Sequence, residues 1–163
     1  MSFAYCPYCS SALIDAEIEG VMRKRCSVPS CRFVHYDNPT PVVAAIVQRD
    51  HHVVLIQNKG WPAEWFGLVS GFLEYKEDPK EAIKREVKEE LLVSCTIESL
   101  VGVYGFEMMN QVLMVYHVTI EDEPSLGDEL AAMKSVSIDA LKPWEMGTGQ
   151  AVKDWLAARC NRD

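Results

Sequence analysis

The stretch GFLEYKEDPKEAIKREVKEELLV, residues 71–93, contains the clearest change of pattern in the chain. Asp78 is a good N-cap residue, Pro79 suits the first position of a helix, and Glu81 completes the pattern of a capping box. After them an aliphatic residue recurs every four positions, as on one face of a helix, at Ile83, Val87 and Leu91. The pattern predicts a helix from Pro79 to about Leu91 with this face buried.

Three carboxylates share one side of the predicted helix, next to its aliphatic face: those of Glu86, Glu89 and Glu90. Like charges at this spacing repel each other by about 0.2–0.5 kcal/mol per pair. The spacing alone leaves two interpretations open. The carboxylates belong either to an ordinary solvated surface, together with Lys84 and Lys88, or to a site where bound cations lie between them.

The context of these carboxylates favours the second interpretation. With its spacing, the segment reads Gly71-x5-Glu77-x7-Arg85-Glu86-Val87-x-Glu89-Glu90-x-Leu92-Val93. It closely resembles the Nudix box, Gly-x5-Glu-x7-Arg-Glu-U-x-Glu-Glu-x-Gly-U, where U is a bulky aliphatic residue, and all defined positions but one agree. The resemblance implies an α/β fold, the Nudix α/β/α sandwich with a mixed sheet.

The resemblance also implies a metal site. Glu86, Glu89 and Glu90 would bind Mg²⁺ or Mn²⁺ with help from the backbone carbonyl of Gly71, and hard oxygen ligands suit both metals. Such metals polarise phosphoryl oxygens and bind the attacking water, which is the chemistry that hydrolysis of a diphosphate linkage needs.

Two further roles follow from the same resemblance. Arg85 would orient Glu86 or pair with Glu77, which would hold the loop against the helix. The general base stays open among three carboxylates. Two of them, Glu86 and Glu89, lie in the box, and the third, Glu129, lies on a downstream acidic loop, residues 121–130.

Leu92 is the one departure from the box, because it stands where the pattern has its last glycine. That glycine lets the chain leave the helix in a left-handed conformation. A leucine in the same geometry would cost roughly 1 kcal/mol, unless the helix ends differently. No predicted metal ligand is lost by the change.

Four of the six cysteines form two close pairs, Cys6-x2-Cys9 and Cys26-x4-Cys31. Both spacings are typical of structural zinc sites, in which four thiolates surround one tetrahedral ion and leave no position for a catalytic water. The segment between the pairs is expected to form a short hairpin that turns near Glu19-Gly20. The alternatives are two disulfides or buried free thiols.

A turn-rich linker at residues 36–41 divides the chain. We expect a zinc ribbon over residues 1–37 and a Nudix hydrolase domain over residues 38–163. In the second part β-rich runs predict strands at residues 42–48, 53–57, 66–70, 100–106, 111–120 and 133–138, followed by a helix over residues 150–159. Because strands and helices mix irregularly, we expect a mixed sheet covered by helices on both faces.

Composition is that of an ordinary globular protein, with 48% hydrophobic and 25% charged residues. The formal net charge of −8 disfavours nucleic acid as a partner, because binding to phosphates depends on Lys and Arg. No apolar run approaches the roughly 18 residues of a membrane span, and residues 1–10 lack the pattern of a signal peptide. We therefore expect a cytoplasmic protein with no membrane association.

A cysteine ribbon joined to a Nudix box is similar in layout to NADH pyrophosphatases and to FAD or ADP-ribose pyrophosphatases. The resemblance implies hydrolysis of a small-molecule nucleoside diphosphate derivative such as ADP-ribose, FAD or NADH. Downstream motifs that mark these specificities are absent from the sequence, so the conjugate stays open. The alternative is a non-catalytic nucleotide-sensing module whose ribbon contacts a protein or nucleic acid. The ribbon would otherwise help to form a homodimer, which is common in this family, or cover the substrate site.

Overall fold

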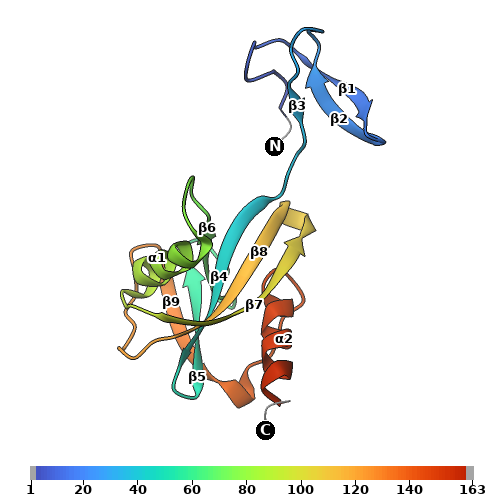
Figure 1. The fold of residues 1–163 in the computed structure, drawn as a ribbon. Helices are drawn as coiled ribbons and strands as arrows, with labels where there is room; N and C mark the ends of the chain where they lie inside the picture. Colours follow the sequence, from blue (N-terminus) through green and yellow to red (C-terminus); the bar gives the residue numbers. More distant parts are fainter. Residues whose placement is uncertain (1–2, 161–163) are drawn as a thin grey trace. The chain divides into compact units, whose positions relative to one another are not determined.

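The computed structural model describes residues 3–160, and these fall into two compact units (Figure 1). The first unit ends at Asn38 and the second begins at Pro39. Neither of the described helices is long and apolar enough to cross a membrane.

The first unit is a small antiparallel sheet with the strand order β1-β2-β3. Its strands are β1 (Leu13–Ile18), β2 (Val21–Cys26) and β3 (Val34–His35). Strands β1 and β2 form the predicted hairpin, and Glu19 and Gly20 form its two-residue turn with φ values of 55° and 77°. Positive φ at both turn residues matches the right-handed twist of the paired strands, which is why such turns are favoured in hairpins.

The second unit is built on a six-stranded mixed sheet with the order β7-β8-β4-β5-β9, and β6 pairs with β4 off this path. The pairing of β4 with β8 is parallel and the others are antiparallel, so the predicted mixed sheet is confirmed. The strands are β4 (Thr40–Arg49), β5 (His52–Asn58), β6 (Val69–Phe72), β7 (Thr96–Phe106), β8 (Gln111–Thr119) and β9 (Leu130–Ser137). Short 3₁₀ turns follow β7 and β9, namely η1 (Glu107–Met109) and η2 (Ile138–Ala140).

Each face of this sheet is covered by a different helix, α1 (Pro79–Leu91) or α2 (Gly149–Cys160) (Figure 1). Val43 belongs to the core beneath α1, and its neighbour Ala44 belongs to the core beneath α2. Because both faces are covered, the central strand β4 is a nearly continuous apolar run rather than an alternating one.

The ends of α1 follow the local sequence. Asp78 Oδ1 accepts a hydrogen bond from the backbone N–H of Lys80 at 2.8 Å, and Pro79 occupies the first turn. Glu81, expected to complete a capping box, instead binds Lys84 Nζ at 2.9 Å. At the other end Leu92 is the C-cap with φ 58° and ψ 24°, the left-handed conformation that the box normally gives to glycine.

Strand β7 begins at Thr96, four residues before the predicted start at residue 100. Two register shifts interrupt its pairing with β8, between Ile97 and Ser99 and between Leu100 and Gly102. A bulge puts an extra residue into one strand and breaks the period-two alternation of burial. The first half of β7 therefore lacks the pattern from which a strand is predicted.

Candidate active site

A cavity of about 300 Å³ lies beside the C-terminal half of α1, and it is lined by Glu86, Glu89, Glu90, Leu92, Gly127, Asp128 and Glu129. The structure thus brings together the four carboxylates that the sequence analysis considers as metal ligands or general base. Glu129, which lies about forty positions downstream of the box, shares one cavity with the three helix glutamates.

The position of Glu129 depends on the acidic loop, which spans residues 120–129, one residue earlier than predicted, and docks on the C-terminal end of α1. The backbone N–H of Ser125 donates to the Leu91 carbonyl at 2.9 Å, and that of Gly127 donates to the Glu90 carbonyl at 2.8 Å. These loop amides satisfy carbonyls that the end of a helix leaves without a partner. A Cβ at Gly127 would overlap the backbone oxygen of Glu89, so the close docking requires glycine.

Lys59, at the end of β5, fixes the other side of the loop. Its backbone N–H donates to the carbonyl of Glu129 at 3.0 Å, and its Nζ donates to the carbonyl of Asp128. No pattern in the sequence singles out Lys59, because its contacts join segments that are distant in the chain.

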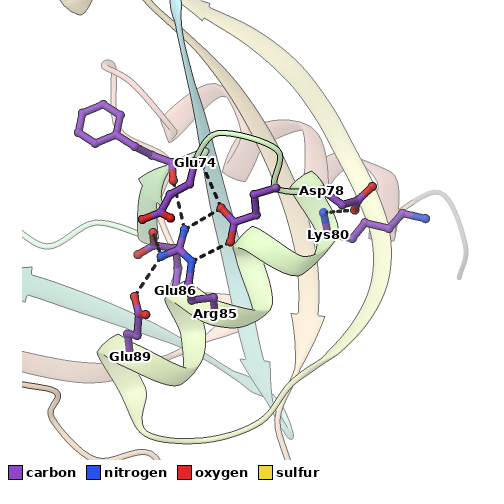
Figure 2. Close-up of polar contacts among 8 residues, drawn as sticks. Glu74, Asp78, Lys80, Arg85, Glu86 and Glu89 are labelled. Atoms are coloured by element: carbon purple, nitrogen blue, oxygen red, sulfur yellow. Dashed lines mark hydrogen bonds and ion pairs between the residues drawn. The ribbon is translucent and has the colours of Figure 1, made fainter.

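Arg85 binds three carboxylates at once (Figure 2). Its guanidinium forks onto Glu77, with Nε–Oε1 at 2.8 Å and Nη2–Oε2 at 3.0 Å, and Nη1 donates to Glu86 at 2.7 Å and to Glu89 at 3.0 Å. Hydrogen bonds to Glu77 raise the pKa of Arg85, and the guanidinium lowers the pKa of Glu77. Both predicted partners of Arg85, Glu86 and Glu77, are therefore in contact with it.

Gly71 lies in β6 opposite Val43 of β4, directly against the helix carboxylates. A Cβ at Gly71 would overlap the Glu86 carboxylate, so only glycine lets the strand approach so closely. Burial raises the pKa of Glu86, and the neighbouring Arg85 opposes this shift.

Glu90 is the buried member of the cluster, with 5% of its surface exposed. Burial raises its pKa to about 8, and the charges of Glu86 and Glu129 add to the shift. Its Oε2 atom is buried without a hydrogen-bond partner among the described residues. A buried carboxylate oxygen that lacks a partner, in a cavity lined by carboxylates, fits the position of a metal ligand.

Asn58 is a residue that the sequence did not point to. Its Oδ1 is, with Glu90 Oε2, one of two buried side-chain atoms that lack a partner in the described part of the chain. In the sheet, Asn58 pairs with Leu130, the residue after Glu129, at a bulge between β5 and β9. No sequence pattern predicts the position of Asn58, because that position depends on the register between β5 and β9.

The four cysteines of the ribbon meet in one cluster, with all ligand atoms within 4.8 Å of one another. The Sγ atoms of Cys6 and Cys31 are 3.7 Å apart, and those of Cys9 and Cys26 are 3.4 Å apart. Thiolates around a tetrahedral zinc ion, with Zn–S bonds of about 2.3 Å, lie about 3.8 Å apart. A disulfide requires about 2.05 Å, so the cluster fits one metal ion and not two disulfides.

Local hydrogen bonds shape the two cysteine turns. The backbone N–H of Ser10 donates to the Cys6 carbonyl at 2.8 Å, and that of Cys31 donates to the Val28 carbonyl at 3.0 Å. Hydrogen bonding by Ser11, first through its backbone, lowers the pKa of Cys9 to about 6. Burial raises the pKa of Cys26 to about 12, so of these two thiols Cys9 ionises more readily to the thiolate that binds a metal.

The aromatic residues of β7 and β8 have structural roles. Tyr116 lies in the core under α1, whereas Tyr104 and Phe106 pack against the core under α2. The Tyr104 hydroxyl donates to Asp154 of α2 at 3.0 Å. Their burial and packing indicate a role in the two cores rather than in stacking on a nucleobase.

Comparisons with known proteins agree with this geometry. The family model described as NUDIX domain matches residues 38–155. An ADP-ribose pyrophosphatase from Methanocaldococcus jannaschii is 28% identical over 127 residues, which cover 74% of this chain and 75% of that protein. The NAD-capped RNA hydrolase NudC from Vibrio vulnificus is 30% identical over 117 residues, 69% of this chain, and the match spans 44% of the relative's length.

A solved structure shows the same fold. The crystal structure of a NUDIX hydrolase from Nitrosomonas europaea superimposes with a TM-score of 0.80 and 24% identity, over 98% of this chain and 93% of that one. The family match covers most of the chain, and the box residues Glu86, Glu89 and Glu90 line one carboxylate-rich cavity. The chain therefore belongs to the Nudix family of hydrolases.

Proposed function

We propose that the protein hydrolyses the diphosphate linkage of a nucleoside diphosphate conjugated to another moiety. Mg²⁺ or Mn²⁺ would be held by Glu86, Glu89 and Glu90 with the backbone carbonyl of Gly71, and would neutralise the phosphates and activate water. The observation that carries this proposal is the buried Oε2 of Glu90, which lacks a partner among the described residues and lies at a cavity lined by carboxylates.

Arg85 acts as a positioning residue in this proposal. Its guanidinium holds Glu86 and Glu89 in place and is itself held by Glu77. The carboxylates of Glu86 and Glu89 are therefore fixed before substrate binds. Glu129 is the proposed general base. It is exposed and lines the same cavity, whereas Glu86 and Glu89 are already bound by Arg85 and serve as proposed metal ligands.

The two units have different parts in the proposed function. Residues 38–163 carry the hydrolytic site, and residues 1–37 form a ribbon around a structural Zn²⁺ bound by Cys6, Cys9, Cys26 and Cys31. The substrate is a small molecule, and we place the reaction in the cytoplasm. Similarity to an ADP-ribose pyrophosphatase and to an NAD-capped RNA hydrolase supports the reaction class and leaves the conjugate open.

Product release from a panel of conjugates tests this function. NADH, FAD, ADP-ribose, nucleotide sugars and dinucleoside polyphosphates would be compared with Mg²⁺ and with Mn²⁺. Wild type should cleave at least one of them. Glu90→Gln should lower kcat/KM on the order of 100-fold, because it replaces a charged metal ligand by a neutral amide.

The matched control is Glu81→Gln, which removes a carboxylate from the same helix outside the cavity, where it binds Lys84. It should cleave as wild type does. If wild type cleaves nothing in the panel with either metal, the proposed function is wrong.

A further inference from the structure

Leu92 combines an unfavourable backbone conformation with an exposed apolar side chain. Its φ of 58° lies in the left-handed region, and its N–H donates to the Lys88 carbonyl at 3.1 Å to end the helix. Its surface is 59% exposed. Glycine would end the helix in the same way without the strain, so the leucine side chain is not explained by the helix end.

Burial of the Leu92 side chain does not offset this strain either. Leu91, the preceding residue, is fully buried in the core under α1, whereas Leu92 points away from that core and lines the acidic cavity. Strain that persists without compensation in the folded chain points to a role in a functional site.

The charges around Leu92 restrict what it can contact. Of the described residues that line the cavity, Leu92 carries the one apolar side chain, Gly127 has none, and the others are carboxylates. Arg85 binds three glutamates, Lys59 binds the Asp128 carbonyl, and Lys88, one turn before Leu92, is not among the lining residues. A group on the Leu92 side of the cavity thus meets an apolar side chain and no cation among the described lining residues.

We propose that Leu92 is a specificity-determining residue that contacts an uncharged ring in the moiety attached to the metal-held diphosphate. The inference rests on the proposed hydrolysis and narrows its substrate class. Conjugates that carry a neutral heteroaromatic ring beyond the diphosphate are preferred over those that end in a bare sugar. Conjugates with additional phosphates are disfavoured, because the carboxylate walls repel them.

NADH and ADP-ribose form a matched pair of probes, since both contain adenosine, the diphosphate and the second ribose. They differ by the neutral dihydronicotinamide ring. Wild type should favour NADH in kcat/KM by about tenfold or more, within the range that apolar contacts provide in enzyme pockets. Leu92→Asn, which tolerates the left-handed conformation, and Leu92→Gly should reduce this ratio about tenfold, mainly through KM for NADH. Leu92→Met should retain most of it.

A second readout does not depend on turnover of these conjugates. Dihydronicotinamide mononucleotide and ribose 5-phosphate, which differ by the same ring, would compete with whichever conjugate the panel identifies. Wild type should be inhibited more strongly by the ring-bearing compound, and Leu92→Asn should remove the difference. Leu126→Asn, an exposed leucine of the acidic loop outside the cavity lining, is the control and should leave both ratios unchanged.

The outcomes separate the two proposals. If wild type cleaves a conjugate but the ratios are the same in wild type, Leu92→Gly and Leu92→Asn, Leu92 is a helix cap only and the inference is overturned while the hydrolysis stands. If wild type cleaves no conjugate, the proposed function fails and the inference falls with it. Melting temperatures confirm that each variant is folded.

Discussion

At the scale of single residues, the positive charge of Arg85 is shared unequally among the carboxylates of the site. Arg85 binds Glu77, Glu86 and Glu89, so these three carboxylates share one compensating positive charge within the protein. Glu90 is more deeply buried and has no such partner for its Oε2. A cation is therefore needed most at Glu90. Without metal, the folded protein must either bury the negative charge of Glu90 or keep its carboxyl group protonated.

This imbalance predicts a pH dependence of stability in the metal-free protein. The pKa of Glu90 is raised from 4.5 to about 8, so between these values the folded chain holds a proton that the unfolded chain has lost. Stability from this group is therefore full at pH below 4.5 and falls as pH rises toward about 8. Glu90→Gln removes the titration, so its melting temperature should rise relative to wild type across this range and level off above it.

Thermal melts of wild type and Glu90→Gln, both treated with a chelator that strips divalent ions and compared over pH 5–9, measure this difference. Mg²⁺ added at high pH should stabilise wild type more than the variant. Melting curves that stay parallel at all pH values would contradict the assigned burial of the charge. Groups remote from Glu90 are the same in both proteins and cancel in the comparison.

At the scale of elements, the sequence predicts α1 well because two local signals coincide there. Asp78 and Pro79 begin the helix, and the aliphatic period gives its buried face as the structure has it. The start of β7 was predicted wrongly, because two bulges break its alternation. The docking of the acidic loop on α1 has no local signal, since it consists of backbone bonds between segments more than thirty residues apart.

Gly127 tests whether this docking positions the site. Gly127→Ala places a Cβ against the Glu89 backbone oxygen, so the loop must move away from α1 and its N–H bond to Glu90 is strained or lost. We expect a loss of about 1–3 kcal/mol in the free energy of unfolding. Activity should fall as well, because Glu129 moves with the loop.

Gly105→Ala is the matched control, because a Cβ at this β7 position meets open space. Its free energy of unfolding, measured by urea denaturation, should stay within about 0.5 kcal/mol of wild type. Equal stability and activity of Gly127→Ala and Gly105→Ala would mean that the loop does not need its close contact with α1.

At the scale of the whole molecule, the two units are stabilised in different ways. The second has two apolar cores, one on each face of its sheet. In the first, the described residues include two that are buried, and both are cysteines of the cluster, Cys6 and Cys26. So small a unit without an apolar core requires another source of stability, which a metal ion provides.

Metal removal should therefore unfold one unit and spare the other. The purified protein is expected to contain one zinc per chain by elemental analysis. A strong chelator, or Cys9→Ser combined with Cys31→Ser, should abolish zinc binding and make residues 3–38 sensitive to protease, because four thiolates that lie 3.4–3.7 Å apart in pairs repel or oxidise without a cation.

Cys95→Ser lies outside the cluster and should retain the zinc. The melting transition of residues 39–160 should persist in every case, since its cores contain no residue of the ribbon. A zinc-free ribbon that resists protease as well as wild type does would show that the cysteines do not hold this unit together.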